Sequence, residues 1–189
     1  MNRHLLDSIS GPGDIKKIPV DQLPALAGQI RSLILESVSR TGGHLASTAG
    51  THFDSGDPDA ADPIERVSCR PDFMILVYPV IRMDEKTHGG SKRNLLGRDP
   101  KPDLLDLFSN EKQVTANTPP AFLAHALDDK VVPPDNSRSF YEALRSCQVA
   151  AEFLELPRGG HGLNGYQGPM WDAWQTKSLE WLAKQKLVP

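Results

Sequence analysis

Apolar residues along the chain change between strand-like and helix-like patterns, and this alternation predicts an α/β fold. Short and nearly continuous apolar runs predict three buried parallel strands, at residues 73–80, 121–126 and 151–156. Apolar residues at three- and four-residue spacing predict helices at residues 21–38, 137–146 and 168–186. Because strands that alternate with helices are joined by right-handed crossovers, the sequence predicts a parallel sheet of about three strands with flanking helices.

The segments between these elements are rich in glycine, proline and charge. Gly42-Gly43 is expected to end the first helix, and residues 50–72 read as a solvated acidic loop. Residues 82–118 are expected to form a long polar connection with one short helix near 102–108. Six apolar residues of the last helix are expected to point mainly inward: Met170, Trp171, Trp174, Leu179, Trp181 and Leu182.

Composition narrows the function classes. The 189 residues carry 21 Lys and Arg against 24 Asp and Glu, so the net charge of −3 gives no electrostatic case for binding nucleic acid or an anionic membrane. The longest apolar run is much shorter than the roughly 20 residues needed to span a bilayer, and the first residues contain no apolar signal segment. Cys69 and Cys147 form neither a disulfide framework nor a metal motif. The expectation is a cytoplasmic protein without a metal or cofactor.

Two candidate catalytic residues follow the last two predicted strands. Asp128 lies in HALDDKVVP and His161 lies in PRGGHGLNG, a glycine-rich loop that lets an imidazole approach a site. They are 33 residues apart, close to the roughly 30 residues of one strand–helix–strand passage. Both are therefore expected at the carboxyl edge of the sheet, as the orienting half of a nucleophilic triad. The structural alternatives are a turn-capping aspartate and an ordinary loop histidine.

A family resemblance supports this interpretation. Residues from about 42 to 186 resemble the C-terminal part of α/β-hydrolase-fold esterases, in particular the carbohydrate esterases related to acetyl xylan esterases. The segments that carry the resemblance include RPDFMILVYPVI, THGGSKRNLLG, SNEKQVTANTPPAFLAHALDDKVVP and GGHG. The resemblance implies a small-molecule ester as substrate, Asp128 as the triad acid and His161 as the triad base. Asp129 is the adjacent alternative for the acid.

The nucleophile departs from the family pattern. No G-x-S-x-G elbow exists in the chain, and the expected position reads ESVSRTGGHLAS. An ungapped alignment on GGH places Arg40 at the nucleophile, one extra residue places Ser39 there, and Ser37 is the next option. We expect Ser39 to attack, with backbone N–H groups near residues 41–43 stabilising the oxyanion. The upstream HGGG-type oxyanion motif is missing.

The first 47 residues resemble a different family, the N-terminus of 1-deoxy-D-xylulose-5-phosphate synthase, a thiamine-diphosphate enzyme. The two resemblances overlap on GGHLAS, which predicts a chimera with a synthase-like helical segment at 1–47 and a truncated hydrolase domain at 48–189. The rest of the thiamine-diphosphate machinery is absent from the sequence, so synthase activity is not expected. His44 is then expected to be a helix-start or packing residue, or at most a bystander at the active site.

Truncation has a structural consequence. A hydrolase sheet of about eight strands requires roughly 240 residues, and this chain retains only the last three strands. The outer edge of strand 73–80 is expected to pair with a second copy of the chain or to be shielded by helix 23–38, which predicts a homodimer or a larger homo-oligomer. Two functions are then possible: a serine esterase acting on short acyl esters, or a non-catalytic, oligomerising fragment without a working nucleophile.

Overall fold

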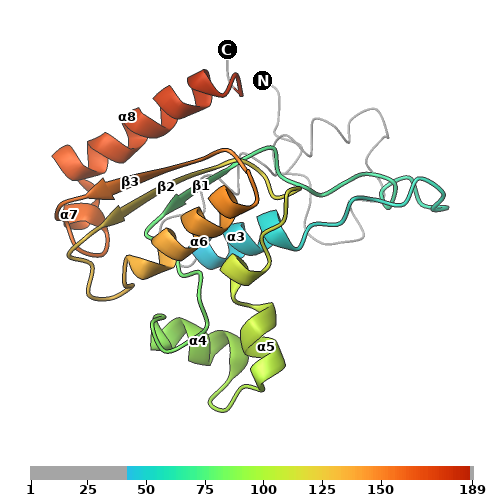
Figure 1. The fold of residues 1–189 in the computed structure, drawn as a ribbon, viewed down its shortest axis with the longest axis horizontal. Coiled ribbons are helices and arrows are strands. Elements are labelled where there is room, and N and C mark those ends of the chain that lie inside the picture. The colour runs from blue at the N-terminus through green and yellow to red at the C-terminus, as the bar shows by residue number, and fades with distance from the viewer. Residues whose placement is uncertain (1–41, 188–189) are drawn as a thin grey trace, which may run out of the picture.

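The computed structural model describes residues 42–187 (Figure 1). The strands are β1 (Met74–Val77), β2 (Ala121–Ala126) and β3 (Ala151–Leu156). The helices are α3 (Gly42–Thr51), α4 (Gly89–Leu96), α5 (Pro102–Leu107), η4 (Asn110–Lys112), α6 (Asp135–Ser146), α7 (Leu163–Tyr166) and α8 (Pro169–Lys184). The helix predicted at 21–38 lies outside the described residues.

The three strands form one parallel sheet in the order β1-β2-β3, as predicted. Figure 1 shows α8 on one face of the sheet and α3 with α6 on the other. Side chains of β2 alternate between these two layers, so Phe122 packs with Trp181 of α8 while Leu123 packs with Phe140 of α6. The sheet is thus covered on both faces, and the carboxyl ends of all three strands meet at one edge.

Helix α3 begins at Gly42, and the helix that Gly42-Gly43 is expected to end lies outside the described residues. A Cβ atom at Gly43 would lie 2.7 Å from the Cα atom of Pro79, which is closer than real side chains approach. Glycine therefore permits α3 to pack directly against the backbone that follows β1. This contact brings the start of α3 to the carboxyl edge of the sheet.

The connection between β1 and β2 contains α4, α5 and η4 rather than the single short helix predicted. Figure 1 shows α4 and α5 projecting away from the sheet. The amphipathic pattern of α4 is weak, and its first turn is capped by His88, whose Nδ1 atom accepts the Ser91 N–H at 3.2 Å. This polar insertion forms one wall of a cavity at the carboxyl edge of the sheet.

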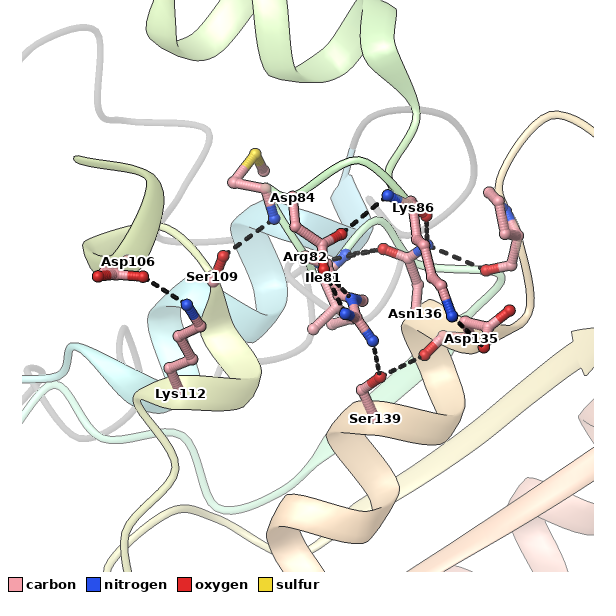
Figure 2. A network of polar contacts seen from close by, with 12 residues as sticks. Ile81, Arg82, Asp84, Lys86, Asp106, Ser109, Lys112, Asp135, Asn136 and Ser139 are labelled. Atoms are coloured by element: carbon pink, nitrogen blue, oxygen red, sulfur yellow. Dashed lines mark hydrogen bonds and ion pairs between the residues drawn. The ribbon is translucent and has the colours of Figure 1, made fainter. Parts of the chain in front are cut away.

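The segment that follows β1 is held in place by Asn136 of α6 (Figure 2). The Asn136 Oδ1 atom accepts the backbone N–H groups of Ile81 at 3.0 Å and Arg82 at 3.1 Å. Its Nδ2 atom donates to the carbonyls of Pro133 at 3.0 Å and Lys86 at 3.2 Å. One completely buried side chain therefore fixes the route of the chain from β1 toward α4.

Further contacts hold the same segment. Ser109 accepts the Met83 N–H at 3.0 Å, and the Arg82 guanidinium pairs with Asp84 and donates to Ser139 of α6 at 2.7 Å (Figure 2). The segment is therefore bound to α6 on one side and to the residues just before η4 on the other.

The prediction of which α8 side chains point inward is confirmed for some residues and wrong for one. Trp181 and Leu182 of α8 are buried as predicted, whereas Leu179 is 62% exposed and was wrongly placed inward. Within residues 42–187, no helix is both long enough and apolar enough to cross a membrane.

Candidate active site

A histidine and a buried carboxylate meet where β2 and β3 end. The His161 Nδ1 atom lies 2.9 Å from the Asp129 Oδ2 atom, within hydrogen-bond distance. The Asp129 side chain is completely buried, whereas the His161 side chain is 28% exposed. Because the carboxylate holds Nδ1, the Nε2 atom is the ring nitrogen left for a substrate or nucleophile.

The structure separates the two adjacent acids that follow β2. Asp128, the predicted triad acid, is exposed, and its Oδ1 atom accepts the Gly160 N–H at 2.8 Å. The contact to His161 is made by Asp129, the adjacent alternative. The Asp129 N–H donates to the Ala126 carbonyl, so the chain turns at once after β2 and directs only the second acid inward.

Asp129 is an ionised group in a buried position. Burial alone would raise its pKa, but hydrogen bonds from His125, His161 and the N–H groups of Val131 and Val132 outweigh burial and lower the pKa from 3.8 to about 2. The carboxylate is therefore negative at every physiological pH. A buried negative charge therefore lies in direct contact with the His161 ring.

The loop that presents His161 depends on glycine. Gly160 and Gly162, on either side of His161, have φ angles of 57° and 92°, in the left-handed region that side chains rarely adopt. The Asp128 carboxylate holds this loop through the Gly160 N–H. The aspartate predicted as the catalytic acid therefore anchors the loop that carries the histidine.

Tyr78 contacts His161 from the end of β1. The two rings pack edge to face, with centroids 4.8 Å apart. The backbone of Tyr78 has a φ angle of 41°, a strained value for a residue with a side chain, and its N–H donates to the Ala124 carbonyl at 2.7 Å. Backbone strain of this kind is concentrated at functional sites. Sequence reasoning missed this residue, because an aromatic at a strand end gives no catalytic signal.

A cavity of about 560 Å³ opens beside His161. It is enclosed by the start of α3, the segment after β1, α4, and the turn after β2. Its polar lining residues are His44, Thr48, His88, Ser91, Asn94 and His161. Its volume falls within the range typical of small-molecule sites. His44, in the first turn of α3, is held by a contact of 2.8 Å between its Nε2 atom and the Phe108 carbonyl.

The predicted nucleophile Ser39, its alternative Ser37 and the aligned Arg40 lie outside the described residues. The described part of the chain starts close after them in sequence, since α3 begins at Gly42. Gly43 in the first turn of α3 lines the same cavity as His161. Among residues 42–187, no cluster of three or more His, Cys, Asp or Glu side chains is arranged to hold a metal ion.

His125 of β2 lies in the interior of the site, behind Asp129. It is completely buried, and its Nε2 atom lies 3.3 Å from the Asp129 Oδ2 atom. The four-residue spacing between His125 and Asp129 was the available signal.

This parallel sheet, with a histidine and an acid at its carboxyl edge, has the architecture of the α/β-hydrolase fold, and solved structures agree. The acetyl ester-xyloside bifunctional hydrolase from Caldicellulosiruptor lactoaceticus is 43% identical, with a TM-score of 0.75 over 80% of this chain and 56% of that chain. The BD-FAE family matches residues 32–144, more than half of the sequence, and the chain belongs to that family. The predicted fold class and esterase resemblance are confirmed.

Curated relatives extend the comparison. Endo-1,4-beta-xylanase B from Butyrivibrio fibrisolvens is 40% identical over 136 residues, covering 70% of this chain and 21% of the relative. The acetylxylan esterase from Xylanibacter ruminicola is 36% identical over 126 residues, covering 64% of this chain and 24% of the relative. The chain thus spans less than a quarter of either relative.

A second family matches the beginning of the chain. The N-terminal region of 1-deoxy-D-xylulose-5-phosphate synthase matches residues 6–52, which confirms the second resemblance. The two matches overlap over residues 32–52, a range that includes the whole of α3. The esterase match includes Asp129 but ends before His161.

Proposed function

We propose that this chain hydrolyses short acyl esters by a serine mechanism in which Ser39 attacks, His161 acts as general base and Asp129 orients His161. The observation that carries the proposal is the 2.9 Å contact between His161 Nδ1 and the buried Asp129 carboxylate. This contact fixes the ring, and it leaves Nε2 to serve a nucleophile at the cavity.

In the proposed hydrolysis, each proton transfer is assigned to a named side chain. The His161 Nε2 atom takes the hydroxyl proton as the Ser39 oxygen bonds to the ester carbonyl, and the Asp129 charge stabilises the resulting imidazolium. His161 next gives that proton to the departing alcohol, leaving an acyl-enzyme. A water molecule, activated by the same nitrogen, releases the acid and regenerates the serine.

The oxyanion of the tetrahedral intermediate needs hydrogen-bond donors. The start of α3 supports a site for it, because helix N-termini present free N–H groups to negative charge, and Gly43 lines the cavity. An acetyl group as the acyl part of the substrate is supported by the named activity of the hydrolase from Caldicellulosiruptor lactoaceticus.

Hydrolysis of p-nitrophenyl acetate by the full chain tests the proposal. Ser39→Ala and His161→Ala should each abolish hydrolysis above the spontaneous rate measured without protein, whereas Ser37→Ala should retain wild-type activity. Asp129→Asn should lower kcat by roughly a thousandfold or more, in line with other triad acids. Asp128→Asn is the matched control, because the asparagine oxygen can still accept the Gly160 N–H. Hydrolysis that survives Ser39→Ala and His161→Ala would refute the proposal.

A further inference from the structure

Behind the carboxylate that contacts His161 lies a second histidine with three polar contacts. The Nδ1 atom of His125 lies 2.8 Å from the Ser137 hydroxyl. Its Nε2 atom lies 2.9 Å from the Val132 carbonyl and 3.3 Å from the Asp129 Oδ2 atom. His125, Asp129 and Ser137 are all buried.

These partners determine where the proton of His125 resides. The Val132 carbonyl can only accept a hydrogen bond, so the Nε2 atom must carry the hydrogen. A neutral imidazole has one N–H, which makes Nδ1 an acceptor for the Ser137 hydroxyl. The Nε2–H group therefore donates to the Val132 carbonyl, and the Asp129 Oδ2 atom lies 3.3 Å from the same nitrogen.

We propose that His125 is a positioning residue, whose Nε2–H group holds Asp129 Oδ2 in the orientation that His161 requires. The resulting line of contacts runs from Ser137 through His125 and Asp129 to His161. The orientation of Asp129 by His125 does not depend on catalysis. Its effect on ester hydrolysis rests on the proposed function.

The two oxygens of Asp129 explain why this contact is needed. Oδ1 accepts two backbone N–H groups, from Val131 and Val132, each at 2.9 Å. Oδ2 contacts the two histidines. His161 stands on a glycine-rich loop and is partly exposed, whereas His125 belongs to the central strand β2. The rigid partner of Oδ2 is therefore His125, and without it this oxygen would depend on the ring that it has to orient.

Two amide substitutions divide the functions of the His125 ring. Glutamine places its amide nitrogen near the position of Nε2, so His125→Gln can still donate to Asp129. Asparagine reaches only to the position of Nδ1, so His125→Asn keeps a polar group near Ser137 and loses the contact to Asp129. A role in packing alone predicts the same outcome for both variants, whereas the positioning role predicts that only glutamine rescues.

The measurement is NMR of the full chain labelled with ¹⁵N-histidine at neutral pH, following the His161 Nδ1 proton. In the wild type and in His125→Gln this proton should appear far downfield and exchange slowly with water. In His125→Asn it should move upfield and exchange at least roughly tenfold faster, the effect expected for loss of a hydrogen bond to a charged group. An unchanged signal in His125→Asn, or equal changes in both variants, would overturn the proposal.

A measurement on the wild-type protein keeps the inference testable if the asparagine variant does not fold. The ¹⁵N shifts of His125 should show a proton on Nε2, and an Nε2 atom without a proton would refute the proposal. Ester hydrolysis reports separately on the proposed function. If the wild-type protein does not hydrolyse esters, the proposed function is wrong. The positioning role of His125 would still hold if the His161 Nδ1 proton signal is lost only in His125→Asn.

Discussion

Replacing Asp129 by asparagine removes the charge on which the site depends. The carboxylate accepts from two histidines and from the N–H groups of Val131 and Val132. Asparagine can still accept at the position of Oδ1, but its amide nitrogen then faces the ring nitrogens His161 Nδ1 and His125 Nε2. Two of the four interactions become contacts between donors, so the folded state loses stability as well as the orientation of His161.

The size of the effect follows from the pKa of Asp129. Its decrease from 3.8 to about 2 on folding is slightly under two pKa units, and at about 1.4 kcal/mol per unit the ionised carboxylate stabilises the fold by about 2 kcal/mol. Because the folded-state pKa is the lower one, this stabilisation is fully present above about pH 5 and is lost as the pH falls through about 4 to about 2. We therefore predict that Asp129→Asn lowers the free energy of unfolding at pH 7 by about 2–4 kcal/mol.

Urea unfolding of the wild type, Asp129→Asn and Asp128→Asn, followed by circular dichroism from pH 7 to pH 3, measures this effect. Asp128→Asn should resemble the wild type, because an exposed side chain is replaced by one that can make the same contact with Gly160. The difference between wild type and Asp129→Asn should shrink as the pH falls below about 4. Equal losses in both variants, or a difference that does not depend on pH, would refute the reasoning.

Three further predictions concern the scaffold and its assembly. Gly43→Ala should destabilise the fold by about 1–3 kcal/mol, because its methyl group would overlap Pro79. A urea midpoint equal to that of the wild type would contradict this prediction. Asn136→Leu should cost about 2–4 kcal/mol, because it leaves two backbone N–H groups after β1 without their acceptor, and a urea midpoint equal to that of the wild type would contradict this role of Asn136. Light scattering at micromolar concentration should show a homodimer, paired through the outer edge of β1, whereas a monomer would contradict the predicted assembly.

The strands could be predicted from the sequence because their signal is local. AFLAHA and AEFLEL gave β2 and β3 with the observed bounds, since short apolar runs in parallel sheets are bounded by polar turns. β1 was predicted at 73–80 but ends at Val77. The left-handed backbone of Tyr78 and the missing N–H of Pro79 end the strand before its apolar residues do.

The helices that sequence reasoning missed depend on tertiary contacts. A pair of glycines normally ends a helix, but Gly42 and Gly43 begin α3 because the helix packs against the backbone at Pro79. The weakly amphipathic GGSKRNLL gave no periodic signal, and α4 is capped by an imidazole, an uncommon N-cap group.

For the acid of the candidate site, the sequence prediction was one residue away from the aspartate that contacts His161. The order of strands placed an aspartate and His161 at the same edge. Whether Asp128 or Asp129 faces inward depends on the turn closed by the Asp129 N–H to the Ala126 carbonyl, which no composition or spacing reveals. The contact between His125 and Asp129 depends on the same turn.

Labelling with a fluorophosphonate, mapped by peptide mass spectrometry, tests the central claim that His161 and Asp129 activate a serine just before α3. We predict an adduct on Ser39 in the wild type and in Asp128→Asn, a much slower reaction in Asp129→Asn, and no adduct in His161→Ala. A wild-type chain that stays unlabelled, or an adduct that forms as fast without His161, would contradict the claim.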